Sequence, residues 1–110
     1  MTAAFAAILF TAIQYIAPSA KADIDAFIRF IWAADRCPGI VVNTEKTLEQ
    51  IEVLGRRQQW DEERVREKIL TESRIAESLY MKNEAAFCRN ILELYKSYDP
   101  EHLRQSGVID

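Results

Sequence analysis

The residues best able to bind a metal or carry out redox chemistry are two cysteines and one histidine, Cys37, Cys88 and His102. A structural zinc site needs four ligands, and these three residues lack the paired spacing of zinc motifs. No Cys-x-x-Cys occurs, which argues against a thioredoxin-type centre. We therefore expect no metal site. Two interpretations of the cysteines remain: a structural disulfide in an oxidising compartment, or two buried free thiols in the cytosol.

Residue sets for enzymatic catalysis are missing from the sequence. The single histidine, His102, lies in a polar segment after Pro100, so we expect a solvated side chain rather than a catalytic base. Neither a phosphate-binding glycine loop nor a zinc-protease motif occurs. Acidic pairs such as Glu45 and Glu49 have basic residues nearby and are typical of solvated helix faces. The sequence predicts a protein that is not an enzyme and needs no cofactor.

Glu72 is the one acidic residue that falls within an apolar helical stripe. At 100° per residue it shares a face with Val65, Ile69, Ala76 and Leu79. Burial of this face would make Glu72 a proton-sensitive group, because desolvation favours the neutral carboxyl. The alternative is that Glu72 lies at the edge of the stripe and reaches solvent, since helical angles drift over a long helix.

The first part of the chain is an uncharged and mostly apolar segment, residues 3–20, and no charged residue precedes Lys21. A proline interrupts the apolar run just before Ala20-x-Ala22, which places small side chains where signal peptidase requires them. We interpret residues 1–22 as a secretory signal peptide that is cleaved, although a basic residue near the start is missing. A retained membrane anchor and a buried helix of a soluble domain are the alternatives.

Cleavage would leave a single domain, residues 23–110. Loss of Lys21 leaves 13 basic and 17 acidic residues in it, a formal net charge of −4. Acids surround every basic cluster, so the positive stripe of a nucleic-acid binder is missing and no nucleic-acid partner is expected. In an oxidising compartment, two cysteines in so small a domain favour a disulfide between Cys37 and Cys88.

The elements that must position these residues are helices. Three glycines and three prolines are too few turn formers for a β-sandwich or barrel. Apolar spacing and capping residues predict four main helices, a short last turn and a frayed tail, over residues 23–34, 44–58, 61–81, 83–98, 100–104 and 107–110. Short links favour a small all-α four-helix bundle, with one disulfide tying the first interhelix turn to the fourth helix.

Phe30 and Trp32 lie off the main apolar stripe of the first predicted helix. That helix is therefore apolar on more than one side. Such a pattern indicates either nearly complete burial or an exposed patch that contacts a partner.

The export signal, the small helical domain and two cysteines 51 positions apart resemble the small periplasmic acid-stress chaperones of Gram-negative bacteria, the HdeA/HdeB type. Residues Ala85–Tyr95 are also similar to the second-cysteine helix of uncharacterised small exported α-proteobacterial proteins. The resemblance implies a periplasmic location, pairing of Cys37 with Cys88, and a homodimer that acid opens to hold unfolded clients. In that family a helix continues where Pro38-Gly39 ends one here.

These observations lead to three functional hypotheses. The first is a protein-binding domain of the periplasm or cell envelope that acts like a chaperone under acid stress. The second is an accessory subunit or inhibitor of one envelope protein, with Phe30 and Trp32 as its contacts. The third is a small enzyme, which the lone histidine disfavours. None of the three requires membrane insertion after cleavage of the signal peptide.

Overall fold

The computed structural model of the chain describes residues 20–110, so residues 1–19 of the expected signal peptide lie outside it. The helices are α2 (Ala20–Ala34), α3 (Thr44–Arg57), α4 (Glu62–Lys82), α5 (Glu84–Ser97) and α6 (Pro100–Gln105). Residues 20–110 contain no strand. The predicted all-α fold, with four substantial helices and one disulfide, is confirmed.

Short polar side chains decide where the later helices begin. Asn43, Asp61 and Asn83 each accept a hydrogen bond from a backbone N–H three residues ahead, at 3.0, 2.8 and 3.0 Å. These bonds satisfy donors that a helix start otherwise leaves unpaired. Asn83 is both the last cap of α4 and the first cap of α5, so a single non-helical residue separates them. The structure therefore separates the two helices predicted over residues 61–81 and 83–98, with the break at Asn83.

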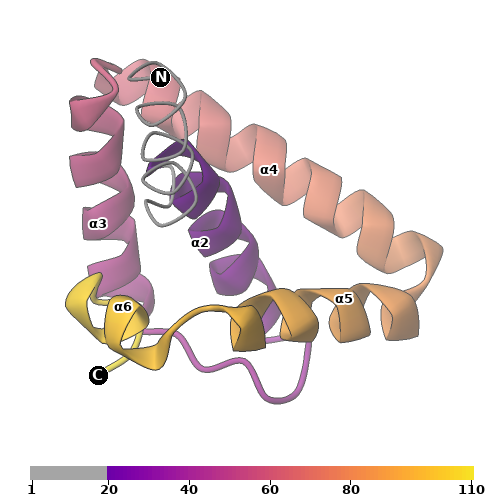
Figure 1. Cartoon of the computed structure of the whole chain (residues 1–110). Coiled ribbons are helices and arrows are strands. Elements are labelled where there is room, and N and C mark those ends of the chain that lie inside the picture. The colour runs from indigo at the N-terminus through magenta and orange to yellow at the C-terminus, as the bar shows by residue number, and fades with distance from the viewer. Residues whose placement is uncertain (1–19) are drawn as a thin grey trace, which may run out of the picture.

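The arrangement is an open V with a helix between its arms (Figure 1). α4 and α5 are the arms and meet at Asn83, while α2 lies between them and α3 lies on the far side of α2. α2 packs against α3, α4 and α5. This central position explains why the sequence of α2 is apolar on more than one side, as the wide stripe predicted. We call the junction of α4 and α5, with the last turns of α4 and the first turns of α5, the elbow.

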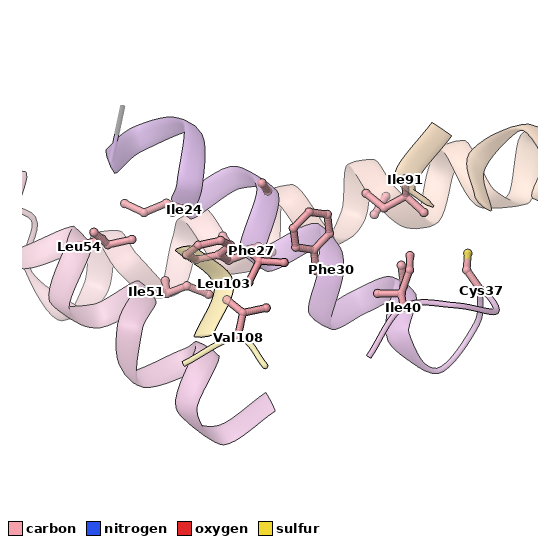
Figure 2. Packing of buried hydrophobic residues seen from close by; sticks show 14 of the residues in the cluster. Ile24, Phe27, Phe30, Cys37, Ile40, Ile51, Leu54, Ile91, Leu103 and Val108 are labelled. Atoms are coloured by element: carbon pink, nitrogen blue, oxygen red, sulfur yellow. The ribbon is translucent and has the colours of Figure 1, made fainter. Parts of the chain in front are cut away.

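The opposite part of the molecule is a closely packed part of the core, and we call it the closed end. It joins α2 and α3 to α6 and the residues that follow α6 (Figure 1). Figure 2 shows side chains from these three regions facing one another. They are all buried: Ile24, Phe27, Ile51, Leu54, Leu103 and Val108. Nearly all of this apolar surface is removed from water, at roughly 25 cal/mol per Å².

The expectation of a frayed tail over residues 107–110 is wrong. Val108 is 0% exposed, and its backbone N–H donates to the carbonyl of Leu103 at 2.9 Å. Gly107 has φ +80° and donates to the carbonyl of Arg104 at 3.0 Å. These two bonds form a Schellman motif, in which a left-handed glycine turns the chain back and an apolar residue packs on the helix it has left.

The turned-back segment is also tied to the start of α3. The backbone N–H of Asn43 donates to the carbonyl of Val108 at 2.7 Å. The side-chain Nδ2 of Asn43 donates a hydrogen bond to Asp110 Oδ1 at 3.0 Å. This hydrogen bond and the charge of Lys46 lower the pKa of Asp110. The C-terminal residues therefore complete the core rather than trail from it.

Candidate functional site

The disulfide joins the elbow to the loop between α2 and α3. Cys37 lies in that loop and Cys88 lies in the second turn of α5, and their Cα atoms are 5.3 Å apart. The predicted pairing is confirmed, and neither sulfur is available as a thiol nucleophile. The turn at Pro38-Gly39 that directs the loop toward α5 uses a left-handed glycine, with φ +86° at Gly39.

Glu72 lies inside the bundle rather than at its edge. It is buried, and its Oε2 accepts hydrogen bonds from Nε and Nη2 of Arg29 in α2, at 3.2 and 3.1 Å. Its Oε1 lies 3.2 Å from Nζ of Lys68, which also lies 2.9 Å from Oδ1 of Asp25. Side chains of alternating charge therefore connect α2 to α4, in the order Arg29, Glu72, Lys68 and Asp25.

Lys68 shows how the opposite charges in this network offset its burial. Removal of its ammonium from water lowers the pKa, but hydrogen bonds to Asp25 and Glu72 outweigh that effect and leave the pKa above its ordinary value. The buried carboxylate of Glu72 thus has cations on both of its oxygens. An ion pair of this kind fixes how two helices align, because each charge is poorly tolerated without its partner.

The structure separates the two residues that were predicted as partner contacts. Phe30 is 0% exposed and meets Tyr95 and Tyr98 edge-on, at 5.2 and 5.6 Å between ring centroids. The hypothesis that Phe30 contacts a partner is therefore wrong for this fold, because α2 is covered on that side by α5. Trp32 is half-buried and packs against Tyr80 and Phe87.

His102 is not the solvated residue that its polar surroundings predicted. Its Nε2 lies 3.0 Å from Oδ2 of buried Asp23, whose Oδ1 accepts a hydrogen bond from the Tyr98 hydroxyl at 3.2 Å. Burial, followed by the nearby charge of Asp23, raises the pKa of Tyr98. Sequence reasoning missed this cluster because its members are 75 and 79 residues apart from Asp23. The three groups tie α2 to the end of α5 and to α6.

A groove opens at the elbow, between the two arms of the V and beside α2. Its volume is about 340 Å³. Its apolar lining comes from α4 and α5: Ala76, Leu79, Ala86, Phe87, Ile91 and Leu94. Its polar lining consists of two cations and two amides: Arg29, Lys82, Asn83 and Asn90. The chemistry of this groove is that of a binding site, with an apolar floor and a few polar groups at its edge.

Large apolar side chains remain exposed on α4, and one of them lines this groove. Leu79 in the lining is 47% exposed, whereas Ile75 at 40% and Met81 at 77%, the latter in the last turn, lie outside the lining. The sequence placed Leu79 on the buried stripe of its helix, but about half of its surface is exposed. One signal was available: α4 has 21 residues, against 14 in α5 and 15 in α2. At 1.5 Å per residue, α4 is about 10 Å longer than either helix, so they cannot cover it along its whole length.

A second hollow of about 520 Å³ lies between α3 and the first half of α4. It combines apolar Trp60, Ile69 and Leu70 with charges of both signs, among them Glu52 and Arg56. The mixed charges of its lining are those of an ordinary solvated surface. The elbow groove, which has only positive charges in its lining, is the better candidate for a specific site.

No family model, curated protein or solved structure matches this chain. The functional argument therefore depends on the residues themselves. Within residues 20–110, no cluster of three or more histidine, cysteine or acidic side chains could hold a metal ion. No helix in that part of the chain is long and apolar enough to cross a membrane.

Proposed function

We propose that this protein is a small exported domain of the periplasm or cell envelope that binds another protein through the elbow groove. The observation that carries the proposal is an apolar groove lined by Leu79, which is 47% exposed, on a helix that also exposes Ile75 and Met81. Exposed apolar residues are common singly, but several of them on one helix that borders an apolar groove mark an interaction site.

The ties that hold the groove open support a binding role. Glu72 and Arg29 lock α4 against α2, and the disulfide holds α5 against the loop after α2. Both walls of the groove are therefore fixed in place before any partner arrives. A preformed site avoids the cost of ordering flexible elements on binding.

Export is the other half of the proposal. The apolar segment before Ala20-x-Ala22 and the disulfide in a domain of this size both favour a compartment outside the cytosol. The intact mass of the protein isolated from its native cell tests this point. Cleavage after Ala22 together with the loss of two hydrogens at the cysteines is the expected result. A chain that retains Met1 and two titratable thiols would refute export.

Site-specific photo-crosslinking in the native cell tests the binding surface. A photoreactive amino acid at Leu79 or Ala86, which both line the groove, should form an adduct of defined mass with a protein. The matched control is the same probe at Val41, which is 70% exposed in the loop between α2 and α3. Equal adducts from Val41 and from the elbow positions, or none from any position, would contradict the proposal.

The pattern of adducts also separates the two kinds of protein binder. A single adduct at neutral pH is expected for an accessory subunit or inhibitor. Many adducts that increase in acid are expected for an acid-stress chaperone, because such a protein opens in acid and loses ties such as those of α2 to α6 and α4. Loss of these ties would release more apolar surface. Size-exclusion chromatography at neutral pH tests the homodimer that the chaperone hypothesis requires.

A further inference from the structure

The elbow groove has the geometry of a site for a helix. Along α5, the lining residues Phe87, Ile91 and Leu94 follow the spacing of four and then three residues, so they form one ridge about 10 Å long. Ala76 and Leu79 continue the apolar surface on α4. An apolar groove between two helices, with residues at helical spacing along its floor, accepts the apolar face of a third helix.

The charges around the groove indicate the chemistry of that helix. Arg29 and Lys82 line it, and no carboxylate does. The acids nearest in sequence on the two arms, Glu77, Glu84 and Glu93, all lie outside the lining. Complementary potentials across an interface guide association and set its specificity.

Both cations can accept a further anionic partner. Lys82 forms no ion pair with any carboxylate in the described part of the chain. Arg29 gives two of its five N–H groups to Glu72, and its side chain is still 36% exposed. Lys82 lies in the last turn of α4, beside the negative end of the helix macrodipole. The full charge of its ammonium exceeds that partial negative charge, so the surroundings of Lys82 remain positive.

We propose that the partner's binding segment is an acidic amphipathic helix, which places apolar side chains on Leu79 and Leu94 and carboxylates against Lys82 and Arg29. The inference rests on the proposed function and specifies its partner. The apolar floor provides most of the affinity. The two cations select acidic segments over basic ones.

Two synthetic helical peptides test this selection. They share one leucine face at positions i, i+3, i+4 and i+7, and carry either glutamate or lysine at the flanking positions. Each is titrated into the isotopically labelled, disulfide-bonded protein, and amide resonances are followed by NMR. We expect shifts centred on residues 79–94, with the glutamate peptide bound at least about tenfold more tightly at low salt, and a smaller ratio as salt is added.

A charge reversal isolates the contribution of Lys82. K82E should remove or invert the preference for the glutamate peptide while the far-UV circular dichroism spectrum stays unchanged. The matched control is K96E, which makes the same change at an exposed position of α5 outside the groove. L79A should weaken both peptides alike, because it alters the shared apolar contact.

Each other outcome has a clear meaning. Equal binding of the two peptides in the groove would overturn the acidic preference and leave the protein-binding function intact. Shifts outside the groove, or no shifts while crosslinking at Leu79 succeeds, would overturn the helix assignment alone. Concentration-dependent shifts in the groove without peptide would show that a second copy of the chain occupies it, and would also overturn the inference.

Discussion

The closed end and the elbow use apolar residues in opposite ways. At the closed end, three separate segments converge, and Ile24, Phe27 and Val108 are almost entirely removed from water. At the elbow only two helices and the flank of α2 meet, and Leu79 and Met81 stay exposed. The difference shows that apolar content does not decide burial by itself. The number of segments that converge at a place decides whether its apolar residues become core or surface.

The sharpest way to break this comparison is to delete one large side chain at each end. F27A should lower the free energy of unfolding by about 3–5 kcal/mol, because it removes a buried ring and leaves a cavity. L79A should change it by no more than about 0.5 kcal/mol, because much of that side chain is already in water. Denaturant unfolding of the oxidised protein at pH 7 measures both. Similar losses at the two positions would mean that the elbow is covered in solution.

The disulfide is the main covalent support of the elbow, so its removal should act there first. The double variant C37S/C88S should lose about 2–4 kcal/mol of stability, the range for a closed loop of this size. Hydrogen exchange should accelerate most in the first turns of α5 and least in α3. Reduction of the unmodified protein serves as a control without any substitution. Uniform acceleration over the whole molecule would show that the two ends unfold as one unit.

The buried ion pairs are expected to have an intermediate effect, since they connect the two regions through α2 and α4. E72Q should cost about 2 kcal/mol. This value lies below the usual range for breaking a buried pair, because Arg29 and Lys68 are partly exposed and can regain water. E77Q makes the same change at an exposed position of α4 and should be nearly neutral. Urea midpoints for the two variants provide the comparison.

The smallest effect concerns Tyr98 at the closed end. Y98F should lose about 1 kcal/mol at neutral pH, the net contribution of one hydrogen bond. Burial and Asp23 raise the pKa of Tyr98 in the folded protein, whereas a tyrosine in the unfolded chain ionises near pH 10. The stabilisation is therefore complete below about pH 10 and is lost as pH rises beyond it.

Alkaline unfolding curves can isolate this hydroxyl. The unmodified protein should become steadily less stable above about pH 10, and Y98F should show a weaker decline. Y80F is the matched control, since the Tyr80 hydroxyl has no hydrogen-bond partner among residues 20–110. Parallel alkaline declines in Y98F and the unmodified protein would contradict the assigned role of Tyr98.

Local signals in the sequence predicted the helices well. The residues Asn43, Asp61 and Asn83 start helices where capping chemistry requires, and the stripe of α5 meets the core as its spacing indicates. The disulfide followed from two cysteines in a small domain. The place of Glu72 on an apolar face made burial one of two interpretations, and the structure decides between them in favour of burial.

Contacts between distant segments could not be predicted from periodicity. Nothing in the sequence indicates that His102 and Asp23 are in contact. The polar residues around His102 therefore predicted a solvated segment. The sequence allowed Phe30 to be either a core residue or a partner contact, because the apolar pattern of a helix does not show how many other helices pack against it. Only the Leu103–Gly107–Val108 pattern, typical of a Schellman motif, could have corrected the expectation of a frayed tail.

The tie between Asp23 and His102 has a consequence for the order in which the molecule assembles. It joins residues 79 positions apart, whereas α4 and α5 are adjacent hairpin partners around one residue. Closing a long loop is slower than pairing neighbouring helices. We therefore expect the hairpin of α4 and α5 to form early in the folding transition state, with high φ-values, and the best-packed part of the protein to assemble last.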